Sequence, residues 1–160
     1  MSRFIFITLF VFITFYPTAT DACSCIGLPQ TDDGIVQFAE SVDKVFVGTV
    51  IELSHREWLD GDDVRMESKG LVRVVEAFRG PAEGDAVELY NLLYSMCGPH
   101  FQMLSTYLFF VVVSDEDGRP YANGCTTFKY TPRAQGDPIP QDYQRARIMQ
   151  MIWALRDAFP

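Results

Sequence analysis

The stretch KVFVGTVIEL, residues 44–53, decides the fold of this chain. It alternates in polarity over part of its length and is rich in β-branched residues, which predicts a β-strand. Gly48, in its middle, predicts a β-bulge or a tight bend. We therefore expect the chain around this stretch to build a β-sheet.

Four further strands are expected on the C-terminal side of that stretch. They are Gly70–Phe78 (GLVRVVEAF), Ala86–Leu93 (AVELYNLL), Ser105–Ser114 (STYLFFVVVS) and Tyr121–Tyr130, which carries Cys125. The strand Ser105–Ser114 is the most apolar and is expected in the centre of the sheet.

Polar residues between the strands predict turns. The stretch His55–Lys69, which holds Asp60, Gly61, Asp62 and Asp63, is expected to be a hairpin loop, and Asp115–Arg119 (DEDGR) a second hairpin turn.

A helix is expected on each side of the strands. Ile35–Ser41 (IVQFAES) has apolar residues at helical spacing and predicts a short helix. Asp142 is expected to cap a final helix that ends at about Ala158. The apolar stripe of this helix consists of Ile148, Met151, Ile152, Leu155 and Phe159. Three prolines mark Thr131–Gln141 as a linker.

Five strands of hairpin-like spacing with a short N-terminal helix and a C-terminal helix predict a mainly β fold. The expected architecture is a small closed barrel, the five-stranded oligonucleotide/oligosaccharide-binding barrel or OB-fold. A β-sandwich is the alternative, although sandwiches usually have about seven strands.

Residues 1–22 are predicted to be a secretory signal peptide. Arg3 supplies the positive charge, Phe4–Tyr16 is an apolar run, and Thr20 and Ala22 are small residues before Cys23. The run is shorter than the ~20 apolar residues that span a bilayer. We expect a mature domain of residues 23–160, secreted to the extracellular space, with the periplasm or cell envelope as alternatives, and no transmembrane span after cleavage.

The composition excludes several classes of function. The net charge is −8 and Lys and Arg form no cluster, which argues against nucleic acid or an anionic membrane as partner. No nucleophile elbow, zinc-protease helix, phosphate loop or dinucleotide fingerprint occurs. His55 and His100 have no metal-ligand spacing, and the aspartates at 60–63 do not fit a calcium loop. We expect no enzymatic activity, no cofactor and no metal of its own.

Four cysteines, Cys23, Cys25, Cys97 and Cys125, remain in the mature chain. In an oxidising compartment an even count predicts two disulfides, for which three pairings exist. A Cys23–Cys25 bridge would close a ring too tight for normal disulfide geometry. The two other pairings stay open, and in both the N-terminus is tied to two distant points of the chain.

Several motifs together resemble the tissue inhibitors of metalloproteinases, whose N-terminal domain is a netrin-like version of the five-stranded barrel. They are CSC at 23–25, FAESVDKVFVGTVIEL at 38–53, VVEAFRG at 74–80, SMCGP at 95–99, TYLFFVVV at 106–113 and NGCTTF at 123–128. The resemblance covers nearly the whole mature chain.

The resemblance implies a function and a disulfide pairing. It implies the bridges Cys23–Cys97 and Cys25–Cys125. It also implies that the free α-amine and the carbonyl oxygen of Cys23 chelate the zinc of a target metalloprotease, while Ser24 enters the specificity pocket of that protease. The implied inhibitory ridge consists of Cys23, Ser24, Cys25 and Ile26 together with Ser95, Met96, Cys97 and Gly98. The partner supplies the zinc, and we expect the inhibitor to be a monomer.

The chain also departs from the family pattern. The inhibitory domain of the family usually has three bridges, whereas this chain can form two, and Thr31, Asp32 and Asp33 stand where the third would start. The final helix replaces the second domain of the family. The alternative is therefore a non-inhibitory, secreted or envelope netrin-like module that binds a protein or a glycan. A lipid on Cys23 is a further alternative, because bacterial lipoproteins are acylated at the cysteine after their signal.

Overall fold

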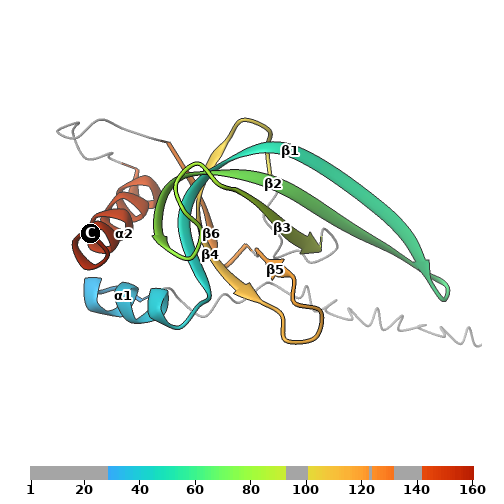
Figure 1. The fold of residues 1–160 in the computed structure, drawn as a ribbon, viewed down its shortest axis with the longest axis horizontal. Helices are drawn as coiled ribbons and strands as arrows, with labels where there is room; N and C mark the ends of the chain where they lie inside the picture. The colour runs from blue at the N-terminus through green and yellow to red at the C-terminus, as the bar shows by residue number, and fades with distance from the viewer. Residues whose placement is uncertain (1–28, 93–100, 123, 132–141) are drawn as a thin grey trace, which may run out of the picture.

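The structure is a computed structural model of the chain, and it describes residues 29–92, 101–122, 124–131 and 142–160 (Figure 1). These residues form a mainly β fold with two helices. The elements are, in chain order, α1 (Asp32–Glu40), β1 (Lys44–Asp60), β2 (Asp63–Arg79), β3 (Ala86–Leu92), β4 (Thr106–Val113), β5 (Pro120–Tyr121), β6 (Thr127–Tyr130) and α2 (Tyr143–Ala158).

The described strands pair as one sheet that closes into a ring. The strand order is β1-β2-β3-β5-β4-β6, and β1 also pairs with β4. All of these pairings are antiparallel except the one between β3 and β5, which is parallel and consists of the single pair Tyr90 and Tyr121. The ring therefore has a long seam between β1 and β4 and a minimal seam between β3 and β5.

Strand β1 bends at the glycine that the sequence singles out. Its first six residues, Lys44–Thr49, pair with β4 on one side, while β1 pairs with β2 along almost its whole length. The register with β2 shifts between Val47 and Gly48, which confirms the predicted irregularity. A Cβ at Gly48 would collide with the side chain of Val72 and would lie 3.1 Å from the carbonyl oxygen of Arg73. Only glycine fits where the two strands approach this closely.

Two layers of apolar side chains lie on opposite faces of β1 and β4. The first cluster takes residues from strands all around the ring and includes Phe46, Val72, Leu89 and Phe109. The second lies between the sheet and the two helices and includes Val45, Val47, Leu108 and Phe110. Figure 1 shows α1 and α2 side by side on this face. Since β4 is covered on both faces, it has an unbroken apolar sequence instead of an alternating one.

The two helices are confirmed in kind and position. Thr31 caps α1, which begins at Asp32, three residues before the expected start. Asp142 caps α2, and its side chain accepts a hydrogen bond from the backbone nitrogen of Arg145 at 3.0 Å. The predicted stripe of α2 faces the core: Ile148, Met151, Ile152 and Leu155 are buried, and Phe159 packs at its margin.

The prediction of a loop over His55–Lys69 is wrong. Strands β1 and β2 continue through it as a two-stranded hairpin, paired down to Asp60 and Asp63. Gly61, with a φ of 65°, is the first of two residues that turn the chain. The stretch is polar because the hairpin projects beyond the ring, so that most of its side chains face solvent on both sides (Figure 1).

The predicted strand Tyr121–Tyr130 is interrupted, so the sheet of the described residues has six strands instead of five. The Ala122 nitrogen donates a hydrogen bond to the carbonyl oxygen of Tyr90 at 2.9 Å, which draws the chain away from β4. The chain returns where the Phe110 nitrogen donates to the carbonyl oxygen of Thr126 at 2.9 Å. Cys125 therefore lies in a turn, not in a strand. The other expected strands correspond to β1, β2, β3 and β4, and β4 is central, with three neighbours.

The close approach at Gly48 yields a stability prediction. Gly48→Ala should destabilise the protein by about 1–3 kcal/mol, because the new methyl group meets the backbone of β2 and must push the strands apart. Gly70→Ala is the matched control: it lies on the same hairpin, and its nearest neighbour would be an ordinary contact of 3.6 Å to Leu53. Urea denaturation measures the free energy of unfolding of both variants. An equal loss of this free energy in both would contradict this account of Gly48.

Candidate functional site

The residues predicted to form the inhibitory ridge lie outside the described residues. These are Cys23, Ser24, Cys25 and Ile26 on one side and Ser95, Met96, Cys97 and Gly98 on the other. Their roles and the pairing of their cysteines stay predictions. The structure does show how the barrel holds the points where the chain enters and leaves the segment 93–100.

Both ends of the segment 93–100 meet strand β2. On the N-terminal side, Leu92 pairs with Glu67. On the C-terminal side, the ring of Phe101 packs against Tyr107 and Phe109, with ring centroids 5.8 and 6.0 Å apart. The same ring lies 3.7 Å from the position that a Cβ of Gly70 would occupy, three positions along β2 from Glu67. The sheet and its core therefore fix both ends of the segment close to one another.

Cys125 provides a further fixed point. It is disulfide-bonded, and its partner lies outside the described residues. The turn that carries it is flanked by the two backbone hydrogen bonds that join Ala122 to Tyr90 and Thr126 to Phe110. A disulfide partner of Cys125 is thus attached to the ring between β3 and β4.

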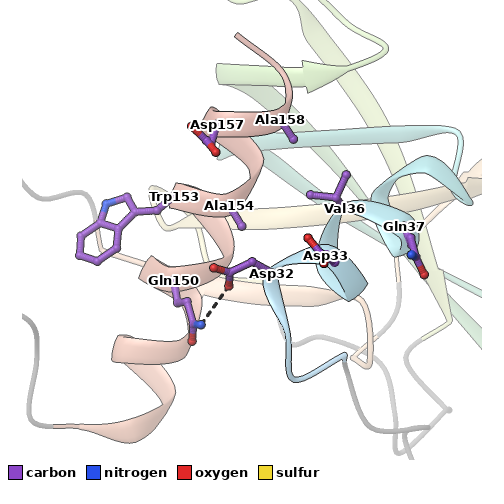
Figure 2. Close-up of a pocket in the computed structure, with 9 residues that line it drawn as sticks. All are labelled: Asp32, Asp33, Val36, Gln37, Gln150, Trp153, Ala154, Asp157 and Ala158. Atoms are coloured by element: carbon purple, nitrogen blue, oxygen red, sulfur yellow. Dashed lines mark hydrogen bonds between the residues drawn. The ribbon is translucent and has the colours of Figure 1, made fainter.

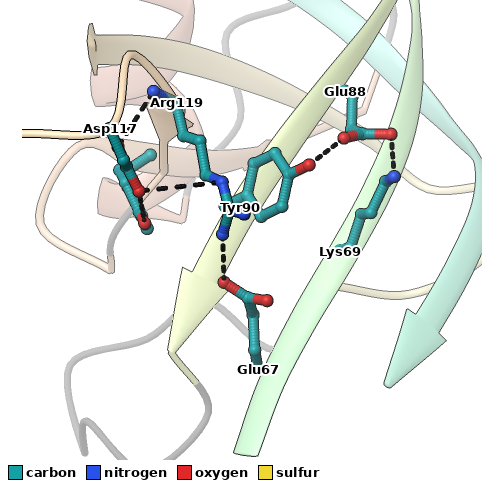
Figure 3. A network of polar contacts seen from close by, with 7 residues as sticks. Glu67, Lys69, Glu88, Tyr90, Asp117 and Arg119 are labelled. Carbon is teal, nitrogen blue, oxygen red and sulfur yellow. Dashed lines mark hydrogen bonds and ion pairs between the residues drawn. The ribbon is translucent and has the colours of Figure 1, made fainter. Parts of the chain in front are cut away.

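A network of charged and aromatic side chains covers the short seam between β3 and β5 (Figure 3). The ring of Tyr90 on β3 lies 6.1 Å from that of Tyr121 on β5. Two cations approach the ring of Tyr90, Lys69 at 5.6 Å and Arg119 at 4.9 Å from the centroid. Glu88 bonds to both Lys69 and the hydroxyl of Tyr90.

The β4–β5 connection joins the network through Arg119 and Asp117. Arg119 lies 3.6 Å from the carboxylate of Glu67 and 3.7 Å from that of Asp117. The hydroxyl of Tyr121 donates to Asp117 at 2.8 Å. The network therefore ties β2, β3, β5 and the preceding turn together where the backbone contributes a single residue pair. The sequence alone does not single out these residues, although Glu67 and Lys69, like Glu88 and Tyr90, stand at the spacing of one strand face.

The network shifts the pKa values of its members. Hydrogen bonds from Lys69 and Tyr90 lower the pKa of Glu88 below its usual range. The bond to Glu88 raises the pKa of Lys69 and of Tyr90. Hydrogen bonds from the Arg119 backbone and the Tyr121 hydroxyl lower the pKa of Asp117. The shifts of Glu88 and Asp117 thus reflect the hydrogen bonds that hold these two carboxylates within the network.

A groove of about 710 Å³ runs between α1 and α2 (Figure 2). Its lining contains the carboxylates of Asp32, Asp33 and Asp157 and the side chain of Trp153, which is 46% exposed. In Figure 2 the indole points away from α1. Gln150 donates to Asp32 at 3.0 Å and joins the two helices across the groove.

No group of three His, Cys, Asp or Glu side chains in the described part of the chain is placed to hold a metal ion. His55 is exposed on β1 opposite Ser68, and His100 lies outside the described residues. Among the helices that the structure describes, none combines the length and the apolar character that crossing a bilayer requires. The chain matches no family model and no curated protein.

The seam network predicts a pH dependence of stability. The pKa of Glu88 is lower in the folded protein than in the unfolded chain. Glu88 therefore stabilises the fold at a pH above the usual carboxyl range, and this stabilisation is lost as the pH falls through the lowered pKa. Wild type should therefore melt at a higher temperature than Glu88→Gln at pH 7, and this difference in melting temperature should disappear toward pH 3. Glu83→Gln, on the turn before β3, is the control and should melt like wild type. A difference between wild type and Glu88→Gln that persists at low pH would contradict the role given to Glu88.

Proposed function

We propose that this chain is a secreted inhibitor of zinc metalloproteases that uses the free N-terminus of Cys23. The proposal also assigns the specific fold, a five-stranded OB barrel of the netrin-like kind. The closed order β1-β2-β3-β5-β4 with its single β3–β5 pair supports a partly open Greek-key barrel, in which the short β6 continues the fifth strand after its interruption.

The chemistry of the proposal depends on backbone atoms of Cys23. An α-amine has an ordinary pKa of ~7.7–8.0, so losing its proton near neutral pH costs only about 1 kcal/mol. The amine and the carbonyl oxygen of one residue form a five-membered chelate with the open position of a catalytic zinc and displace the water that attacks the substrate. Ser24, the next residue, then points its small side chain into the specificity pocket.

The anchoring of the segment 93–100 is the observation that carries the proposal. Leu92 and Phe101 meet β2 three positions apart, and Cys125 holds a disulfide at the neighbouring turn. A binding segment whose two ends are held has fewer conformations to lose when it meets a partner, and such pre-organisation raises affinity. The ridge that the sequence predicts would thus be attached to the ring on both sides of the segment 93–100.

Addition of one alanine before Cys23 tests the proposal. The extended protein should inhibit zinc metalloproteases at least about a hundredfold more weakly, because the amine that binds the zinc becomes an amide. The measurement is the inhibition constant against a panel of purified zinc proteases, with the intact mass establishing that the mature chain begins at Cys23, carries no lipid and has no free thiol.

The matched control carries the same alanine after Pro160. It should inhibit like the native protein, and both extended proteins should keep the native melting temperature. Equal inhibition by the two extended proteins, or none by the native protein, would refute the proposal.

The second candidate function is a non-inhibitory binding module, and the β1–β2 hairpin favours it. Near the tip of the hairpin, Leu59 is 74% and Val64 is 48% exposed, and they pair with one another across the two strands. Trp58 is half-buried beside them. Apolar side chains on a projecting arm are typical of protein-binding surfaces. In this reading the two disulfides are purely structural and the partner binds the hairpin.

Leu59→Ser with Val64→Ser tests this candidate. The double variant should lose about 10-fold or more in affinity for any partner that native protein captures from its secretion medium, because the apolar contact area is removed. Its melting temperature should stay unchanged, since both side chains face solvent. Val75→Ser with Val112→Ser, two exposed valines on the ring, is the control. Unchanged capture by the hairpin variant would exclude the hairpin as the binding surface.

A further inference from the structure

Strand β3 has one edge that is open over residues 86–88 in the part of the chain that the structure describes. On one side, β3 pairs with β2 along its whole length, from Ala86 to Leu92. On its other side, the described strands provide a single pair, that of Tyr90 with Tyr121. The first half of β3 therefore has a paired edge toward β2 and an open edge opposite, which we call the β3 edge.

The backbone groups of Ala86 and Glu88 point toward the β3 edge. In an antiparallel pair, successive residues direct their N–H and C=O groups alternately toward the partner strand and away from it. The carbonyl oxygen of Asp85 accepts a hydrogen bond from the Val74 nitrogen of β2 at 2.8 Å. The carbonyl oxygen of Tyr90 accepts one from the residue after β5, on the side away from β2. Both bonds assign the even-numbered residues of β3 to the open side.

The β3 edge lies in a groove of about 750 Å³. Residues 85–88 contribute to its lining, and so do residues 118–120 of the β4–β5 connection. The connection has its own backbone bonds: the Arg119 nitrogen donates to Asp117 at 3.0 Å, and the Arg119 carbonyl oxygen accepts from Ser114 at 2.9 Å. Pro120 has no N–H to offer. A groove of this size is in the range of small-ligand pockets, which suits a few residues of an extended chain and not a second folded sheet.

The charged side chains of the groove favour a basic ligand. Asp43, Asp85 and Glu88 supply carboxylates, and Lys44 and Arg119 supply cations. Glu88 and Arg119 are engaged in the seam network. Asp43 and Asp85 accept hydrogen bonds from backbone nitrogens, at 2.7 and 2.9 Å, and the ion pairs of the described residues include neither of them. Two carboxylates thus stand against one lysine.

We propose that the β3 edge binds an extended peptide segment of a partner protein, which adds to the sheet as a short strand and directs a basic side chain toward Asp43 and Asp85. In β-strand addition, main-chain hydrogen bonds provide affinity and side chains at alternate positions provide specificity. Here the N–H and C=O groups of Ala86 and Glu88 bond to the peptide. The site is independent of the proposed function, because it uses neither the N-terminus nor the segment 93–100.

Amide hydrogen exchange of the free protein, followed by NMR, tests whether the edge is open. The amides of Ala86 and Glu88 should exchange at least about tenfold faster than those of Val87 and Leu89, which face β2. Equal protection of all four amides would overturn the proposal. Protection of Ala86 and Glu88 that rises with protein concentration would identify a second copy as the occupant and would overturn it as well.

The binding probe is the peptide TVTKVTV, blocked at both ends and labelled with fluorescein. It should bind measurably below about 1 mM and slow the exchange of the Ala86 and Glu88 amides. Methyl groups on every second peptide nitrogen should weaken binding at least about tenfold in one of the two alternate sets and leave it nearly unchanged in the other, because one edge of an added strand faces β3. Glutamate in place of the peptide lysine should weaken binding at least about fivefold. Absence of binding, or equal effects of the two methylated sets, would overturn strand addition, and equal binding of the glutamate peptide would overturn the basic specificity.

Ala86→Pro tests the edge from the side of the protein. The substitution removes one N–H of the β3 edge and no hydrogen bond to β2, and proline is tolerated at the first residue of a strand. The side chain of Ala86 is exposed, so Ala86→Ser is a matched control that keeps the N–H. Ala86→Pro should bind the peptide at least about tenfold more weakly than Ala86→Ser, which should bind like native protein. Equal binding by the two variants would overturn the proposal, and if Ala86→Pro does not fold, the methylated peptides decide.

Discussion

The ring depends on the double pairing at the start of β1. Residues 45–49 pair with β2 on one side and with β4 on the other, and Val45, Phe46 and Val47 are buried on both faces of the strand. Without the β1–β4 pairing, the strands β1-β2-β3 and the strands β5-β4-β6 would be joined only by the single pair of Tyr90 and Tyr121. The bend at Gly48 makes this double pairing compatible with the curvature of so small a ring. The side chains of Thr49 and Thr106 add a hydrogen bond of 2.9 Å at the end of the paired stretch.

The elements that the sequence predicts well are those whose burial leaves a regular pattern. Helix α2 carries a polar cap at Asp142 and an apolar stripe from Ile148 to Leu155, and both signals depend only on neighbours within the helix. Strand β4 is recognisable because it packs between the ring interior and the helices, so nearly every residue is apolar. The apolar pattern predicts the start of α1 three residues late, because its first apolar residue is Ile35, whereas the cap is Thr31.

The features that the sequence does not predict are set by geometry between distant segments. The hairpin between Leu53 and Gly70 has the sequence of a loop because both of its faces are mostly exposed, which removes the usual contrast between apolar and polar positions. The turn at Cys125 arises from backbone bonds to β3 and β4, neither of which leaves a signal nearby. The seam network joins residues of β2, β3 and the β4–β5 connection, and only the strand register brings Lys69, Tyr90 and Arg119 together.

The two candidate functions use the same barrel but different chemistry and different parts of the chain. Zinc chelation uses the backbone amine and carbonyl of one residue, so it depends on where the mature chain begins and on how firmly that end is held. Binding through the hairpin uses the side chains of Leu59 and Val64 and is indifferent to the N-terminus. The contacts of Arg147 with Pro29 and of Gln150 with Asp32 join α2 to the first residues that the structure describes, at the end of the fold opposite the hairpin (Figure 1). The two candidate functions would therefore place their partners at different ends of the same barrel.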